Sequence, residues 1–211
     1  QGAPDESLID IVFGTPDINT TKVEATMFRG TLSQVFSDTR KGNLAVHSSS
    51  YEKMYQNLYV AEYDGTLVNM DGYRDPTERD KLLISGNLVN KIPAGSVKLT
   101  ILVGAELIDT ENNNLRYDTF WSTTRDDNEV FDILRPMGFT VNADGIAASV
   151  DFTTSLKTKT SSDIKVISLY IQDQIDLTDN IKLMIGGRHD SFDITVVDIK
   201  NMTSESRKDT E

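Results

Sequence analysis

Apolar and polar residues alternate over a long stretch between residues 164 and 192. One parity holds Ile167, Leu169, Ile171, Ile175 and Leu177, and the other holds Ser168, Gln172, Gln174 and Asp176. A period of two residues is typical of a β-strand with one apolar and one polar face. Residues 178–180 contain Asp and Asn, which favour a turn, and the apolar parity resumes after them at Ile181, Leu183 and Ile185. We therefore predict two long strands joined by a very short turn, with Asp173 as a single acid on the apolar face.

The same alternation predicts four further strands, at residues 23–36, 43–55, 78–92 and 97–107. The last is the clearest, because every second residue from Val97 to Leu107 is apolar. A helix would scatter these residues around its circumference. Short turns are expected at residues 37–42 and 93–96. The pattern indicates an all-β, antiparallel, up-and-down meander.

Long polar connections separate the predicted hairpins. We place them at residues 56–77 and 109–157. The first contains Asp64-Gly65 and Asp71-Gly72, dipeptides that favour a small hairpin of its own. The second is a run of about 50 residues, which a compact soluble domain seldom holds as an irregular segment. Short turns at one end of a meander and long loops at the other are typical of transmembrane β-barrels.

Composition narrows the possible functions. The chain has 211 residues, a net charge of −12 and no cysteine. The negative charge argues against a nucleic-acid partner, because phosphate binding requires a basic surface. The missing cysteines exclude disulfides and thiolate chemistry. The sequence contains no apolar run near the roughly 20 residues of a membrane-spanning helix.

A barrel requires more strands than the pattern supplies. Six strands are predicted, and transmembrane barrels begin at about eight. We therefore expect the chain to be an internal portion of a larger barrel, an expectation that fits its start at Gln1 and its charged end at residues 204–211. The apolar parity would face lipid. The polar parity would face a wet lumen and includes Arg29, Ser33, Lys98, Thr100, Glu106, Gln172 and Gln174.

Several motifs resemble those of a known family. Residues 169–175 read LYIQDQI and residues 185–192 read IGGRHDSF, similar to a YxQDQ strand followed by a GxRxD strand. Weaker matches are LVGAE at 102–106, VFSD at 35–38, YEKMYQNLY at 51–59 and FGTP at 13–16. Together and in this order, they resemble the TonB-dependent outer-membrane receptors, in the catecholate-type part of the siderophore-receptor branch.

The resemblance implies a 22-stranded barrel in the bacterial outer membrane, plugged by an N-terminal domain. Such a receptor binds a ferric siderophore and imports it with energy delivered by TonB. It is not an enzyme and has no covalently bound cofactor. Its partners would be TonB, the iron–siderophore complex, and the membrane lipid and lipopolysaccharide around it. The plug, the TonB-binding N-terminal region and the C-terminal strands are expected to lie outside this chain.

Aromatic and arginine residues gather in the predicted connections. Tyr55, Tyr59, Tyr63, Tyr73, Tyr117 and Trp121 occur there together with Arg74, Arg79, Arg116 and Arg125. Rings can stack on the arms of an anionic ferric chelate, and guanidinium groups can neutralise its charge. We take as candidate ligand contacts Tyr59, Tyr63, Tyr73, Arg74, Tyr117, Trp121 and Arg125. In the alternative interpretation, rings of this kind form an interfacial girdle or pack loop on loop.

The sequence predicts no catalytic or metal site. His47 and His189 have no partner at a metal-ligand spacing, and the acids at 109–113 lack the glycine of a calcium loop. Nucleophile-elbow, phosphate-loop and HExxH motifs do not occur. Two alternatives to the receptor stay open: an outer-membrane porin or adhesin barrel, and a soluble β-sandwich binding module. The sandwich would need strands of about 5–6 residues.

Overall fold

The computed structural model describes residues 17–95, 97–134, 139–178 and 180–211. Its elements are β1 (Thr20–Ser37), β2 (Arg40–Tyr63), β3 (Leu67–Ala94), β4 (Val97–Trp121), β5 (Glu129–Asp132), β6 (Val150–Asp176), β7 (Lys182–Asp198) and β8 (Thr203–Thr210). The described residues contain no helix, and hence none long and apolar enough to cross a membrane. The FGTP motif at 13–16 and residues 96 and 179 of the predicted turns lie outside the described ranges.

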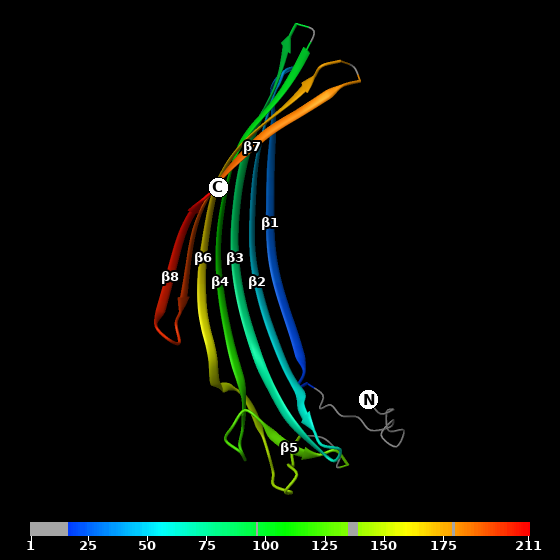
Figure 1. The fold of residues 1–211 in the computed structure, drawn as a ribbon, viewed down its shortest axis with the longest axis vertical. Coiled ribbons are helices and arrows are strands. Elements are labelled where there is room, and N and C mark those ends of the chain that lie inside the picture. The colour runs from blue at the N-terminus through cyan, green and yellow to red at the C-terminus, as the bar shows by residue number, and fades with distance from the viewer. Residues whose placement is uncertain (1–16, 96, 135–138, 179) are drawn as a thin grey trace. The chain divides into compact units, whose positions relative to one another are not determined.

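One sheet contains all eight strands. Its order is β1-β2-β3-β4-β6-β7-β8, and β5 pairs with β3 away from this path. Figure 1 shows successive strands lying side by side in chain order. Neighbouring antiparallel strands can be joined by short turns. The predicted all-β, up-and-down meander is confirmed.

The strands are longer than the alternation predicted. β2 has 24 residues, β3 has 28, β4 has 25 and β6 has 27. The region 56–77 was therefore wrongly interpreted as a long connection, because β2 and β3 run through it and only residues 64–66 separate them. Strands of this length also contradict the soluble sandwich alternative.

The region 109–157 also differs from the prediction. β4 continues to Trp121 and β6 begins at Val150, so the connection is much shorter than about 50 residues and contains β5. The charged end of the chain is also a strand. β8 pairs with β7 from Asp198↔Thr203 to Ser191↔Thr210. Backbone pairing with a neighbouring strand forms both β5 and β8. Neither strand alternates apolar and polar residues, so the sequence pattern did not predict them.

The chain forms two compact units. Unit 1 comprises Gln1–Val23, Lys53–Thr77 and Asn114–Lys159. Unit 2 comprises Glu24–Glu52, Glu78–Asn113 and Thr160–Glu211.

Unit 1 contains a hydrophobic core. Its buried members are Leu58, Val68, Met70, Trp121, Phe131, Phe139, Ala148 and Phe152. The Trp121 and Phe131 rings lie 5.2 Å apart, and the Phe131 and Phe139 rings 5.3 Å apart. β5 brings Phe131 into this core by pairing with β3, with Val68 opposite Phe131. The segment between β4 and β6 is therefore folded onto the sheet.

Unit 2 has an exposed apolar face. Along β6, Ile167, Leu169 and Ile171 are each more than half exposed, whereas Ser168 between them is fully buried. In β7 the partners of Leu169 and Ile171 are His189 and Gly187. A soluble protein buries its apolar residues, and an exposed apolar strand face is the arrangement expected of a sheet surrounded by lipid.

The opposite face of unit 2 holds a polar network. The Arg188 Nη2 atom lies 3.1 Å from Glu106 Oε1 and donates to Ser168 Oγ at 2.8 Å. Arg188 Nε also donates to Asp190 Oδ1 at 2.8 Å. On β1–β3, the Ser33 hydroxyl donates to Asn43 Oδ1 and the Asn43 amide donates to Asn87 Oδ1. Ser33 and Glu106 thus lie on a polar face, as predicted.

Asp173 faces the partner Ile185 in β7. Its Oδ1 atom is buried and has no hydrogen-bond partner among the described residues. The acid that interrupts the apolar parity is thus sheltered by the sheet, three residues before β6 ends at Asp176.

Candidate ligand-binding face

Three tyrosines of unit 1 lie together on two neighbouring strands. Tyr55 and Tyr59 are four residues apart on β2, so strand alternation places them on the same face. Tyr73 on β3 lies between them, with ring centroids 5.7 Å from Tyr55 and 6.1 Å from Tyr59. Cross-strand neighbours on one face of a sheet are expected to touch in this way.

Arg116 on β4 completes this cluster. Its guanidinium carbon lies 4.0 Å from the centre of the Tyr73 ring, within the range of a cation–π interaction. Its Nε atom lies 3.5 Å from Asp75 Oδ1, an ionic contact without hydrogen-bond geometry. We call Tyr55, Tyr59, Tyr73 and Arg116 the tyrosine face.

The tyrosine face is the open side of this part of the sheet. Neighbouring residues on a strand point to opposite faces. Leu58, Gly72 and Thr119 are buried on the core side, and each adjoins a residue of the open side. Tyr59 is 39% exposed, and the Arg116 side chain is 42% exposed. A ligand can therefore reach the rings and the guanidinium group.

Asp71 fixes the Tyr59 ring. The Tyr59 hydroxyl donates a hydrogen bond of 2.8 Å to Asp71 Oδ2. This hydrogen bond, together with burial and the Asp71 charge, raises the pKa of Tyr59 to about 12. Tyr59 is therefore protonated at physiological pH and presents a neutral ring.

Carboxylates and cations of unit 1 act on one another. Lys157 Nζ lies 2.9 Å from Asp118 Oδ2, and this contact raises the pKa of Lys157. Burial raises the pKa of Asp75, and the charges of Arg116 and Lys53 partly offset that effect. Burial and then the negative charges of Asp71, Asp126 and Asp118 raise the pKa of Asp127.

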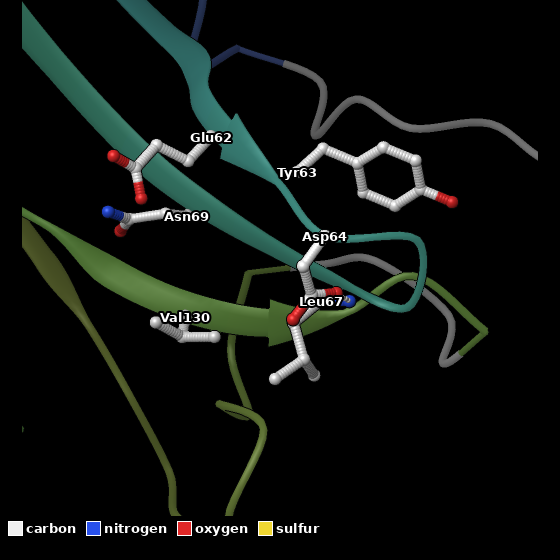
Figure 2. Close-up of a pocket in the computed structure, with 6 residues that line it drawn as sticks. All are labelled: Glu62, Tyr63, Asp64, Leu67, Asn69 and Val130. Atoms are coloured by element: carbon white, nitrogen blue, oxygen red, sulfur yellow. Dashed lines mark hydrogen bonds between the residues drawn. The ribbon is translucent and has the colours of Figure 1, made fainter.

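A cavity of about 560 Å³ lies at the tip of the β2–β3 hairpin. Figure 2 shows the Glu62 and Asn69 side chains extending in the same direction, with Val130 below them in this view, while the Tyr63 ring extends to the other side. The Asn69 Oδ1 atom is buried without a hydrogen-bond partner in the described part of the chain. Asp64 accepts hydrogen bonds from the Thr66 and Leu67 amides, which lower its pKa. Its carboxylate therefore shapes the turn.

Comparison with known proteins shows the family to which the chain belongs. A family model described as TonB dependent receptor-like, beta-barrel, matches residues 11–211. The chain belongs to this family. The exposed apolar face and the long antiparallel strands are the physical features of such a barrel. Family membership also contradicts the porin or adhesin alternative.

Solved structures have the same fold as this TonB-dependent receptor chain. The siderophore receptor PiuA from Acinetobacter baumannii has a TM-score of 0.72 at 14% identity, over 96% of this chain and 31% of that one. BauA, the ferric preacinetobactin receptor from Acinetobacter baumannii, has a TM-score of 0.62 at 19% identity, over 90% and 27%. The ferric citrate transporter FecA, in its unliganded form, has a TM-score of 0.63 at 12% identity, over 90% and 24%.

These identities are low, so the likeness concerns the fold. The chain spans about a quarter to a third of the length of these structures. No curated protein sequence matches the chain.

The predicted ligand contacts of this TonB-dependent receptor chain fall into different places. Tyr59 and Tyr73 lie together on the tyrosine face. Tyr63 is exposed, and its hydroxyl donates to the Gly65 carbonyl at 2.7 Å. Arg74 and Tyr117 directly follow Tyr73 and Arg116, so they point to the opposite side of their strands.

The other two candidates lie next to the core of unit 1. Trp121 is fully buried, so its place in the core replaces the predicted role as a surface ligand contact. Arg125 is exposed at the start of the folded segment with a positive φ of 56°, and its amide donates to the Trp121 carbonyl. Trp121 therefore belongs to the core, and Arg125 belongs to the turn that follows β4.

Sequence reasoning did not select Arg116 or Asp71 for the site. Arg116 was one of four arginines in regions expected to be loops, and no spacing rule separated it from the others. The signal available was strand parity, which becomes useful only once β3 and β4 are known to extend this far. Among the described residues, no group of three or more His, Cys, Asp or Glu side chains is arranged to hold a metal ion.

Proposed function

We propose that this chain is part of an outer-membrane receptor that binds a ferric siderophore and imports it with energy supplied by TonB. The observation that supports this most directly is the exposed apolar face of β6 and β7 in a chain of the TonB-dependent receptor family. Neighbours of the same fold include a siderophore receptor and a ferric preacinetobactin receptor. The proposal includes the catecholate-type branch, since flat catechol rings can stack on tyrosines.

In this proposal the strand ends at the short turns face the periplasm. A tilted membrane strand needs about 9–11 residues. Tyr59 lies 19 residues after Arg40, the first residue of β2 (59 − 40). The tyrosine face would therefore lie outside the hydrocarbon region, where a ligand arriving from the medium meets it. The complete barrel would have 22 strands, with the plug and the closing strands supplied by other parts of the protein.

The tyrosine face is the proposed first contact for the chelate. Tyr55 and Tyr59 offer ring surface to the organic arms, and Arg116 offers two kinds of contact, the edge of its guanidinium plane and its charge. The Tyr73 ring holds Arg116 in place through the cation–π contact. Outer-membrane lipid and lipopolysaccharide would surround the apolar face, and TonB would act through the N-terminal region of the receptor.

The proposal is tested with the protein expressed from its whole gene in an iron-starved strain that lacks its own receptors. We expect uptake of a ⁵⁵Fe-labelled siderophore that depends on TonB. The variants Tyr73→Leu and Arg116→Gln should weaken siderophore binding to outer-membrane vesicles by about fivefold or more, as expected for loss of a cation–π or charged contact of about 1 kcal/mol.

The matched control is Arg79→Gln. Arg79 is an exposed arginine of β3 whose Nε donates to Asn112 Oδ1, and it lies in unit 2. This variant should bind the siderophore as the unaltered receptor does. If no iron chelate is taken up in a TonB-dependent manner, although the receptor reaches the outer membrane, the proposed function is wrong.

A further inference from the structure

The ion pair between Arg116 and Asp75 has no hydrogen bond. Arg116 Nε lies 3.5 Å from Asp75 Oδ1, and this buried oxygen accepts no hydrogen bond from the described residues. A strong arginine–carboxylate pair makes two parallel hydrogen bonds of about 2.7–2.9 Å. In the same unit, Lys157 Nζ approaches Asp118 Oδ2 to 2.9 Å. Asp75 is therefore a weak partner for Arg116.

The position of Asp75 is poorly compensated. Its side chain is 33% exposed, although the Oδ1 atom is enclosed. Burial raises the pKa of Asp75, and attraction to Arg116 does not cancel this effect. A carboxylate held firmly by a guanidinium group would have a lowered pKa. An enclosed acceptor without a hydrogen bond costs free energy, and rotation of this side chain toward water would recover part of it.

The Tyr73 ring holds the Arg116 guanidinium group independently of Asp75. The guanidinium carbon lies 4.0 Å from the ring centre, in a cation–π contact. The Arg116 side chain is 42% exposed. A guanidinium group presents its N–H donors in a planar fork that matches two adjacent anionic oxygens. Arg116 can therefore exchange one anionic partner for another while its contact with the ring stays in place.

A ferric catecholate has the chemistry to replace Asp75. Each catechol arm carries two adjacent, negatively charged oxygens that bind iron, and its flat ring can stack on a tyrosine. Two oxygens side by side match the arginine fork as a carboxylate does. A partly exposed ion pair without good geometry contributes little, whereas a two-point charged contact is stronger. Exchange of Asp75 for a catecholate arm is therefore favourable.

We propose that Asp75 is a displaceable partner of Arg116, which it contacts in the ligand-free receptor and leaves when the oxygens of a bound ferric catecholate take its place. This inference rests on the proposed function and adds Asp75 to it as a specificity-determining residue. Asp75 competes with an anionic chelate for Arg116 and so lowers its affinity. A neutral chelate does not enter this competition.

The test measures binding to outer-membrane vesicles that contain the receptor expressed from its whole gene. The probes are a trianionic ferric tris-catecholate and a neutral ferric tris-hydroxamate, at equal amounts of receptor folded in unheated electrophoresis. Asp75→Asn should raise affinity for the trianionic chelate by about two- to fivefold, as expected for removing one partly exposed competing charge, and leave affinity for the neutral chelate unchanged. Asp75→Ser should give the same increase, and Asp75→Glu, which keeps the charge, should give none.

A double-mutant cycle shows whether Asp75 acts through Arg116. In an Arg116→Gln background, Asp75→Asn should no longer raise affinity for the trianionic chelate, because the competition for Arg116 is gone. If Asp75 only repelled the anion, the increase would be the same in both backgrounds. Asp144→Asn is the matched control, since Asp144 is an exposed acid of the same unit, and it should change neither affinity.

Three results would overturn the inference: no increase in Asp75→Asn and Asp75→Ser, an increase that persists in full in the Arg116→Gln background, or failure of the trianionic chelate to bind the unaltered receptor. In each case TonB-dependent uptake of another ferric chelate leaves the proposed function standing. Absence of TonB-dependent uptake of any ferric chelate, with the receptor in the outer membrane, contradicts both.

Discussion

At the scale of single residues, two glycines allow close packing. A Cβ on Gly72 would lie 2.7 Å from Leu58 Cδ2 and would collide with the Asn57 carbonyl oxygen. A Cβ on Gly104 would collide with the Tyr170 ring. Only a residue without a side chain lets the core of unit 1 pack against β3 at Gly72 and lets the Tyr170 ring pack against β4 at Gly104.

The Tyr59–Asp71 pair gives a prediction about pH. The folded-state pKa of Tyr59 is raised from 10.0 to about 12. A raised pKa means that the pair contributes its stability fully below pH 10 and loses it as the pH rises through about 12. Alkaline titration of tyrosinate absorbance, with the receptor in detergent, should show a component near pH 12 that is missing from the Tyr59→Phe variant.

Asp71→Asn is the control for that titration. An amide still accepts the hydrogen bond, which is the largest cause of the raised pKa, but it has no charge, so the pKa of Tyr59 should fall below about 12 without returning to 10.0. An unchanged titration in Asp71→Asn would show that the Asp71 charge does not contribute to the raised pKa of Tyr59.

At the scale of elements, β5 is a strand that the rest of the sheet makes possible. It has four residues, and two of them, Glu129 and Phe131, are buried. Its register with β3 places Phe131 opposite Val68, between the rings of Trp121 and Phe139. So short a strand would be unstable alone, and its pairing depends on the core beneath it.

Phe131→Ala should therefore unfold the segment between β4 and β6. Removal of a buried Phe ring costs about 3–5 kcal/mol. The sequence contains one tryptophan, and Trp121 lies in the same core. Its fluorescence emission should shift to longer wavelength in Phe131→Ala, and the transition in a urea titration should move to lower concentration.

Leu134→Ala is the comparison for this experiment. Leu134 lies two residues after β5 ends and is 69% exposed. Its truncation should leave the fluorescence emission unchanged and the free energy of unfolding within about 0.5 kcal/mol of the unaltered protein. Equal effects of Phe131→Ala and Leu134→Ala would contradict the assignment of Phe131 to a core.

At the scale of the whole molecule, the apolar face must be covered for the chain to be stable. Ile171 is 54% exposed, and its neighbour Gln172 points to the other side of β6. Such a face covered by water would favour aggregation, and the same face covered by lipid is stabilised.

The two neighbours provide a matched pair of substitutions. Ile171→Lys should reduce assembly in the outer membrane and destabilise the protein in lipid by up to about 2–4 kcal/mol, because it places a charge on the lipid face. Gln172→Lys places the same charge on the polar face and should assemble normally. Assembly is measured by the fraction of protein that stays folded in unheated electrophoresis, and equal behaviour of both variants would contradict the orientation of β6.

The sequence alone determined the strands that have one apolar face. The hairpin of residues 164–192, the strand from Val97 and the family resemblance all follow from alternation and local motifs, because a lipid-covered strand must place apolar residues at every second position. Ser33 and Glu106 were placed on the polar face for the same reason.

Where the alternation is weak, only the tertiary structure decided which residues form strands. β8 has no apolar residue, and β5 and the far ends of β2, β3 and β4 lack a regular alternation of apolar and polar residues. Pairing with neighbouring strands supplies their backbone hydrogen bonds. The same pairing buried Trp121, which sequence reasoning had placed on the surface, and brought Arg116 over Tyr73 from a strand 43 residues away (116 − 73). Contacts between distant residues depend on the register of the strands, and the register is set by the sheet as a whole.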